Sequence, residues 1–249
     1  MRAKELLPEI QRTATDRPQD DAPQSEKVSL KGVKSVPGAA NLGYYLTGGR
    51  GQMMGMLTGT NYVLTLVDLK KSKTIGWLGL RDTIFPLPNS RQVANVLIYP
   101  EYRGRGLGQS LYGVATKVLG MTIVADDTQT PEARRLWTYL HNIPGVSVRG
   151  WINFFASDVD PADDLFGNVQ SNLRKIARLQ GLPKGQTPRP LIRPRDNYSY
   201  VYYDFPVQSG PGGRELQAAE NIAAIYTSYH PEDNRRNFDV GLYARWTGQ

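Results

Sequence analysis

The chain has 249 residues, of which 40% are hydrophobic and 21% are charged, a mixture typical of a globular protein. It has no cysteine, which excludes disulfides and thiolate chemistry, and its two histidines are too few for a histidine-rich zinc site, so we expect no metal. The net charge of +7 favours a polyanionic partner.

The N-terminal sequence predicts neither a membrane span nor a leader. No apolar run approaches the roughly 20 residues needed to cross a bilayer, so we expect no membrane partner. Residues Met1–Leu7 turn polar too soon for a secretory signal peptide, and we expect a cytoplasmic protein. Residues 1–27 are predicted to be an arm or linker, because 11–26 are polar, carry prolines and show no hydrophobic periodicity.

Residues 28–155 alternate strand and helix patterns, which predicts one domain of the α/β (α+β) class. A glycine-rich stretch, Pro37–Thr60, interrupts the pattern. The helix 131–140 has a capping residue, Thr130, and a proline at its first position. The predicted strands are 28–36, 61–68, 74–80, 91–99, 121–125 and 146–155, and the predicted helices are 106–119 and 131–140.

Residues 156–249 are predicted to be a C-terminal extension made of a helix from Leu165, a basic linker, a strand and a second helix, 216–229. Seven basic residues and no acid lie between Asp164 and Asp196. The aromatic strand 198–205 has two interpretations: it pairs along an exposed edge during assembly, or it completes the core sheet. The basic residues are Arg174, Lys175, Arg178, Lys184, Arg189, Arg193 and Arg195.

The stretch Val96–Leu111 has the pattern of an anion-binding turn. A strand ends, the chain turns through Gly104, Gly106 and Gly108, and a helix starts. Such a turn aims unpaired backbone N–H groups at one point, which makes an anion site. A P-loop would need a lysine before the hydroxyl residue, where Gln109 precedes Ser110, and a dinucleotide fingerprint would need glycine in place of Gln109.

The spacing Arg103-x-x-Gly106-x-Gly108 resembles the pyrophosphate motif of the GNAT (general N-acetyltransferase) superfamily. The stretch 130–137 is similar to that family's second helix, and the resemblance spans roughly residues 60–155. It implies a mixed, mostly antiparallel sheet flanked by helices, with acetyl-CoA as cosubstrate. The residues it implies for CoA binding are Leu97, Ile98, Tyr99, Arg103, Gly104, Arg105, Gly106, Leu107, Gly108 and Gln109.

The sequence departs from the family at its catalytic positions. Trp137 stands where most members carry the tyrosine that protonates the leaving thiolate, and indole has no such acid function. The candidates that remain for catalysis are Glu101, Asp126 and Tyr139, with Tyr112 as another tyrosine nearby. The glycine-rich stretch replaces the helices that usually form the acceptor side.

These features lead to three hypotheses for the function of the protein. The first is an N-acyltransferase that moves an acetyl group from acetyl-CoA to an unidentified amine. The second is a catalytically reduced GNAT-like subunit of an assembly such as a virus particle, with partners bound through the N-terminal arm and the C-terminal extension. The third is nucleic-acid binding through the basic segment 174–195.

Overall fold

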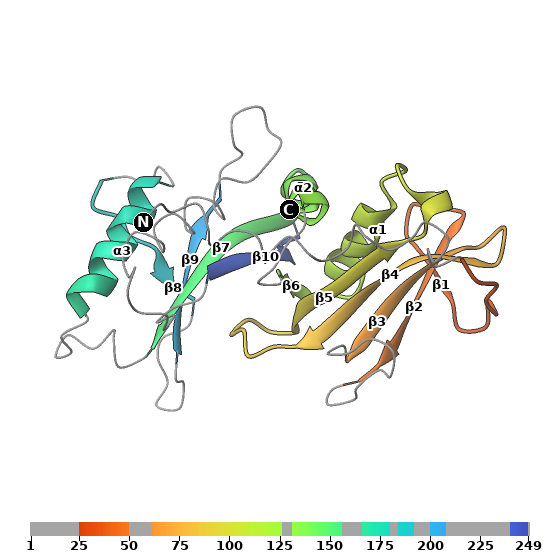
Figure 1. Ribbon diagram of the computed structural model, residues 1–249, viewed down its shortest axis with the longest axis horizontal. Coiled ribbons are helices and arrows are strands. Elements are labelled where there is room, and N and C mark those ends of the chain that lie inside the picture. The colour runs from red at the N-terminus through yellow and green to blue at the C-terminus, as the bar shows by residue number, and fades with distance from the viewer. Residues whose placement is uncertain are drawn as a thin grey trace, which may run out of the picture.

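The computed structural model describes residues 25–49, 61–125, 131–155, 166–179, 184–191, 200–207 and 240–248. Its strands form one ten-stranded sheet in the order β1-β2-β3-β4-β5-β6-β10-β7-β9-β8 (Figure 1). The strands are β1 (Lys34–Ser35), β2 (Leu42–Gly48), β3 (Tyr62–Asp68), β4 (Lys73–Asp82), β5 (Ser90–Ile98), β6 (Thr122–Val124), β7 (Val146–Phe155), β8 (Arg189–Pro190), β9 (Tyr200–Pro206) and β10 (Val240–Trp246).

The sheet is mixed and mostly antiparallel. Its parallel pair is β5 with β6, and the other neighbouring strands pair antiparallel. The fold class expected from the sequence, a mixed sheet with flanking helices, is therefore confirmed. No described helix is long and apolar enough to cross a membrane.

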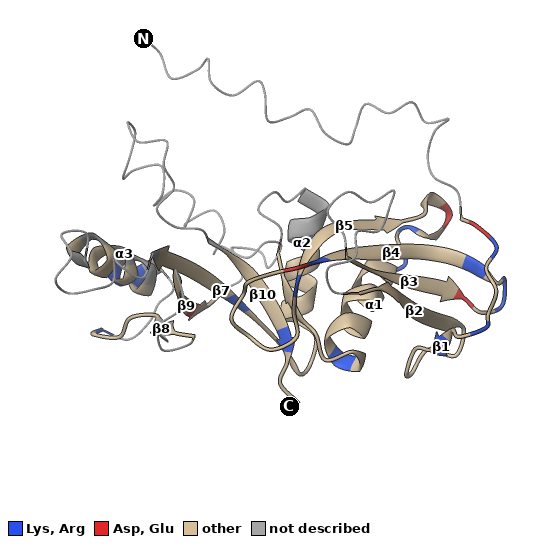
Figure 2. Cartoon of the chain, turned by 90° about the horizontal axis from the view of Figure 1, so that it is seen from below, with Lys and Arg blue, Asp and Glu red and all other residues tan. Residues whose placement is uncertain are grey.

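Three helical segments flank the sheet. Helix α1 (Leu107–Gly113) continues without a break into the π-helical turn η3 (Val114–Val118), and together they cover β3 to β6 and contact β10. Helix α2 (Pro131–His141) packs on α1 and β7. Helix α3 (Phe166–Leu179) lies at the opposite end of the sheet from β1, beside β8 and β9 (Figures 1 and 2).

The alternation of side chains along β7 divides the core into two layers. Val148, Ile152 and Phe154 belong to the large cluster that also holds buried residues of α1, α2 and α3. Trp151 points to the other face, where it meets a second cluster of Phe85, Val124, Tyr202 and Tyr243. Since successive strand residues point to opposite faces, the two layers follow directly from the period of two.

A half-buried carboxylate, Asp204, joins the C-terminal strands on that second face. The Arg149 guanidinium of β7 forms an ion pair with Asp204 of β9. The Tyr243 hydroxyl of β10 donates to the same carboxylate at 3.2 Å. Burial, with the Asp204 charge nearby, raises the pKa of Tyr243, so its hydroxyl stays protonated as a donor.

The structure places the described strands of the C-terminal third, β8, β9 and β10, in the same sheet as the rest of the chain. Strand β10 lies between β6 and β7, and β9 pairs with β7 over its whole length. Of the two interpretations of the aromatic strand, the structure therefore shows the one in which it completes the core sheet. The predicted boundary between residues 155 and 156 runs through one continuous sheet.

Other expectations differ in detail. The strand predicted over 28–36 is reduced to Lys34–Ser35, with a single bridge from Lys27 to Lys73. The glycine-rich stretch contains strand β2, which the sequence did not predict, and no helix within its described part, 37–49. The predicted arm up to residue 24 and the predicted helix 216–229 lie outside the described residues.

The contact between β7 and β9 supplies a stability test. An alanine Cβ at Gly150 would lie 2.1 Å from the ring of Phe205, which is fully buried. We expect Gly150→Ala to lower the free energy of unfolding by about 1–3 kcal/mol, since overpacking displaces a fixed ring. Chemical denaturation measures the difference.

Gly113→Ala is the matched control. Gly113 has ordinary helical angles and no atom within 4 Å of the added methyl. Alanine there should leave the free energy of unfolding unchanged or raise it by roughly 0.5–1 kcal/mol. Equal stability of the two variants would contradict the packing described for β7 and β9.

Candidate functional site

The candidate site begins where β5 separates from β6. Strand β5 pairs with β4 from Arg91 to Ile98, but it pairs with β6 only through Ser90, Arg91 and Gln92. The Gln92 side-chain amide donates to the Ala125 carbonyl at 3.3 Å, which closes the short contact. Among the described residues, no strand pairs with the second edge of β5 beyond Gln92. Its backbone groups are therefore open to another partner.

A β-bulge lies at the start of this free edge. Asn95 pairs with Gly79 and Val93 pairs with Leu80, so Ala94 is the extra residue on β5. A bulge bends its strand and increases the local twist, and bulges are common beside active sites. The bulge at Ala94 therefore turns β5 away from β6.

A short buried turn follows the strand. Tyr99 and Tyr102 are buried at the two ends of the 3-10 turn η2 (Pro100–Tyr102), and the Tyr102 N–H donates to the Tyr99 carbonyl at 2.9 Å. The Tyr99 N–H donates to the carbonyl of Ile75 in β4 at 3.0 Å. These contacts fix the point from which the glycine turn starts.

The glycine turn has the conformation that its composition predicts. Gly104 and Gly106 have φ values of +74° and +71°, in the left-handed region where side chains are strained. Among the described residues, nothing lies within 4 Å of a Cβ placed at Gly104, and only the Gln109 side chain, at 3.9 Å, approaches one at Gly106. The outer face of the turn is open.

Five successive backbone N–H groups of this turn, from Gly104 to Gly108, form no hydrogen bond with a described residue. The bonds on either side are satisfied: Arg103 donates to Pro100 at 3.2 Å and Gln109 donates to Gly106 at 3.0 Å. Residues 104–106 are exposed, and Leu107 and Gly108 are half-buried. A run of free N–H groups before a helix favours an anion.

The two arginines of the turn have different contacts. The Arg103 Nε donates to the Ile98 carbonyl at 3.0 Å, so its guanidinium braces the turn against the end of β5. The Arg105 guanidinium lies 5.8 Å from the Tyr102 ring centre and is exposed. Arg105 is therefore the freer of the two to contact a ligand.

The remaining predicted binding residues lie close to the turn. Leu97 and Ile98 are half-buried at the end of β5, and Leu107 and Gln109 are half-buried in the first turn of α1. A Cβ at Gly108 would lie 3.9 Å from Leu136 of α2, so the helix start is also where α1 meets α2. The structure thus brings all ten predicted CoA-binding residues into one continuous strand end, turn and helix start.

Glu101, a predicted catalytic residue, is in η2 and is exposed. It accepts a hydrogen bond from the Ser25 hydroxyl, which lowers the pKa of the Glu101 carboxyl. A carboxylate with a lowered pKa is a weaker general base. These contacts do not favour Glu101 as the group that deprotonates an amine.

The other residues considered for catalysis do not gather at the glycine turn in the described part of the chain. Tyr139 is on the outer face of α2 and is 52% exposed. Trp137 is 2% exposed and packs edge-on against Tyr112, with 6.1 Å between ring centres, so it belongs to the hydrophobic core. Asp126 lies outside the described residues.

No group of three or more histidine, aspartate or glutamate side chains with metal-binding geometry occurs in the described part of the chain. His141 ends α2 and is half-buried.

Comparisons with known proteins give limited information. No protein-family model matches the chain, and no curated protein matches it. Among solved structures, it is similar to a GCN5-related N-acetyltransferase from Kribbella flavida, at 15% sequence identity and a TM-score of 0.25. The match covers 74% of this chain and 59% of that protein, so the chain spans less than two thirds of its length. This is a weak similarity at the level of the fold.

Sequence reasoning missed two features of the site. The Ala94 bulge leaves no local signal, because it depends on the pairing of β5 with β4. The bond from Ser25 to Glu101 joins residues 76 apart in the chain. Neither can be found from the local pattern around the glycine turn.

The Ser25 contact gives a pH test. Since the Ser25 hydroxyl is the largest cause of the lowered pKa, Ser25→Ala should raise the pKa of Glu101 toward its ordinary value. NMR titration of the side-chain carboxyl carbon measures this. Ser29→Ala is the control, because Ser29 accepts only from the Lys31 N–H among described residues. An unchanged Glu101 pKa in Ser25→Ala would contradict the contact.

Proposed function

We propose that the chain is an N-acyltransferase that transfers an acetyl group from acetyl-CoA to an amine. The observation that carries the proposal is the run of five N–H groups from Gly104 to Gly108 that have no partner among the described residues, directly after a strand whose second edge is unpaired in the same part of the chain. The run suits the pyrophosphate of CoA, and Arg105 adds a charge-assisted hydrogen bond. The free edge of β5 suits the amide groups of the pantetheine arm.

The chemistry requires little more than positioning. The amine nitrogen attacks the thioester carbonyl carbon, the C–S bond breaks, and the thiolate leaves with a proton from solvent or from the amine. A backbone N–H on the free edge of β5 would stabilise the oxyanion, and holding the two reactants together lowers the barrier. The described residues of the strand end and the glycine turn would bind the acetyl donor, and they do not identify the amine.

A second candidate is a CoA-binding protein whose catalysis is reduced. Three observations favour it: Trp137 is buried in the core, Tyr139 is on the outer face of α2, and the pKa of Glu101 is lowered. Such a protein would bind CoA through the same turn and act through partners in an assembly.

Substitution in the glycine turn tests CoA binding. Gly106→Ala forces a side chain into a left-handed position, which costs about 1–2 kcal/mol and moves the free N–H groups. We expect affinity for CoA to fall about tenfold or more by isothermal titration calorimetry, because several hydrogen bonds depend on that geometry.

Gly120→Ala is the matched control. Gly120 also has a positive φ, +61°, and has nothing within 4 Å of an added Cβ, but it follows η3 and lies outside the turn. It should carry a similar strain and keep CoA affinity. Wild-type protein that shows no heat of binding at millimolar CoA would refute the proposal.

Trp137 separates the two candidate functions. Trp137→Phe should leave acetyl transfer to a panel of amines unchanged, because the buried indole supplies no proton. Trp137→Tyr should raise the rate only if the acid position alone limits turnover, which would favour the reduced enzyme. A thermal melt of each variant controls for lost core packing. A large loss of rate in a stable Trp137→Phe variant would show that the indole acts in catalysis.

A further inference from the structure

A basic hollow lies at the end of the sheet farthest from the glycine turn. It has a volume of about 510 Å³ and lies between α3 and the turn that precedes β8. In the sheet order, β6, β10, β7 and β9 separate β8 from β5, so this hollow is distinct from the candidate CoA site. Its lining residues are Arg174, Ala177, Arg178, Lys184, Gly185, Gln186 and Thr187.

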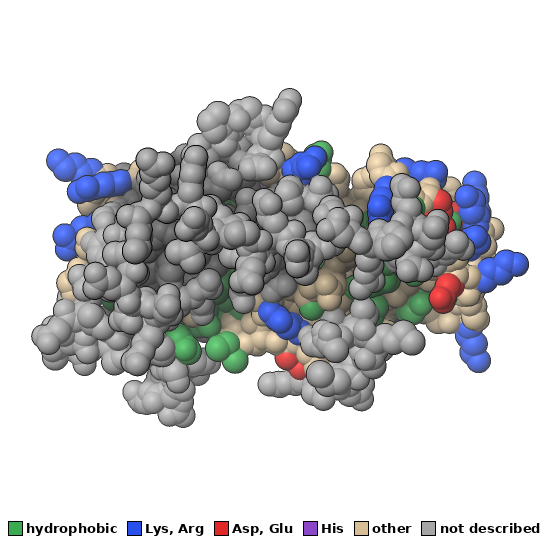
Figure 3. Space-filling model, in the orientation of Figure 1, with side chains coloured by type: hydrophobic (Ala, Val, Ile, Leu, Met, Phe, Trp, Pro, Cys, Tyr) green, Lys and Arg blue, Asp and Glu red, His purple; other side chains and the backbone are tan. Residues whose placement is uncertain are grey.

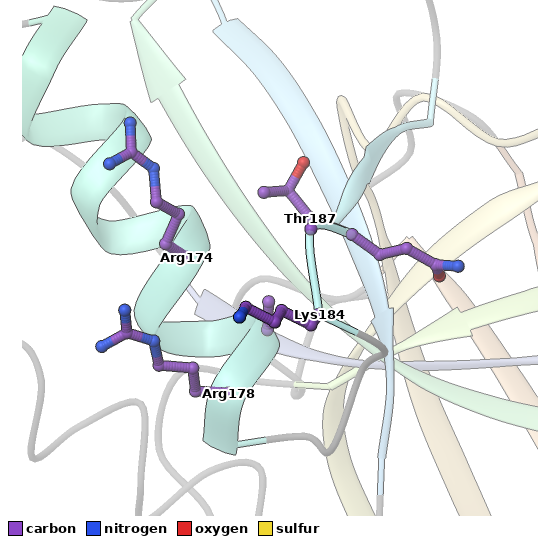
Figure 4. Close-up of a pocket in the computed structure, with 7 residues that line it drawn as sticks. Arg174, Arg178, Lys184 and Thr187 are labelled. Carbon is purple, nitrogen blue, oxygen red and sulfur yellow. The ribbon is translucent and has the colours of Figure 1, made fainter.

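The lining carries three cations and no carboxylate. Arg174 and Arg178 are one helical turn apart on α3, and Lys184 extends toward the helix from the facing turn (Figure 4). All three are exposed, and none forms an ion pair with another described residue. The hollow therefore holds a positive charge that no described side chain balances.

The helix is anchored independently of these cations. Val169, Leu173 and Ala177 are buried on its inner face, while Arg174 and Arg178 follow the next face at the same spacing. Gly185, with a φ of +87°, belongs to the turn that also contributes Gln186 and Thr187 to the lining. Loss of either arginine should therefore leave the fold intact.

The charge pattern distinguishes this end from the other basic end. Figure 3 shows Lys and Arg side chains at both ends of the face in view, and acidic side chains toward the β1 end and near the middle. Toward the β1 end, the Lys70 and Lys71 N–H groups donate to Asp68, Lys73 acts on Glu101, and Lys71 and Arg105 lie over the Tyr102 ring. From Leu165 to Arg195 the sequence has seven cations and no acid.

We propose that this hollow binds the phosphodiester backbone of nucleic acid. Guanidinium groups match phosphate geometry with paired N–H donors, and two on successive helical turns can meet successive phosphates. Lys184 adds a point charge, and Thr187 and Gln186 add neutral donors. Near β1 the cations lie beside carboxylates, because Lys73 acts on Glu101 and Asp68 accepts from the Lys70 and Lys71 N–H groups, so the field there is partly compensated.

Binding is expected to be independent of base sequence. The tyrosines of β9 are engaged: Tyr202 packs against Phe85 and Trp151, and Tyr203 packs against Phe154. They are therefore not free to stack on bases, and contacts to phosphate should dominate.

Fluorescence anisotropy with a labelled 30-base-pair DNA duplex and a labelled 30-nucleotide single strand tests the proposal. The variant Arg174→Gln with Arg178→Gln should lose affinity tenfold or more in low salt. The slope of log affinity against log salt should become shallower by about two, since each lost phosphate contact removes roughly 0.9. The control, Lys31→Gln with Lys34→Gln, removes the same charge from exposed positions near β1 and should change affinity less than about twofold.

Three other results would overturn the proposal that the hollow binds nucleic acid. Equal losses in both double variants would reduce binding to net charge and overturn the proposal. Displacement of the duplex by inorganic phosphate, or by polyglutamate at equal charge, would overturn it in favour of a small anion or an acidic protein. No binding of either labelled probe at micromolar protein in low salt would also overturn it. None of these outcomes bears on CoA affinity, which is measured separately.

Discussion

The candidate site depends on how briefly β5 pairs with β6. Strand β6 is three residues long, and only Ser90–Gln92 of β5 contact it. Beyond that point β5 keeps its bonds to β4 but has a free edge among the described residues, and the bulge at Ala94 turns it away. Because unpaired backbone groups require partners, a ligand with amide groups is suited to this edge. The glycine turn then begins where the free edge ends.

The short β6 is held in place by a strand from the far end of the sequence. Strand β10 pairs with β6 on one side and with β7 on the other, and the Ala125 N–H donates to the Leu242 carbonyl at 2.8 Å. Asp204 joins β7, β9 and β10 through Arg149 and Tyr243. The region predicted to be an extension is thus part of the framework that positions β6, while α3 and β8 place the basic hollow at the far end of the same sheet.

Local patterns predicted the parts of the fold that local sequence determines. The hairpin of β3 and β4, the strand β5 and the helix α2 agree with their alternation, prolines and caps to within two residues. The glycine turn was predicted because Gly104 and Gly106 are required where φ is positive. The place of β10 could not be predicted, since Val240–Trp246 shows at most an alternating pattern and the choice of neighbours depends on pairing across about 90 residues. The same holds for the Ala94 bulge and for the Ser25 contact that lowers the pKa of Glu101.

In the function proposed above, one ligand occupies both the free edge of β5 and the glycine turn. Hydrogen–deuterium exchange of the full chain, with and without saturating CoA, tests it most directly at the level of backbone amides. The account predicts slower exchange in two segments together, Val93–Ile98 and Gly104–Gly108, with little change in α3. CoA binding that leaves both segments unprotected, or protects only α3, would contradict the account.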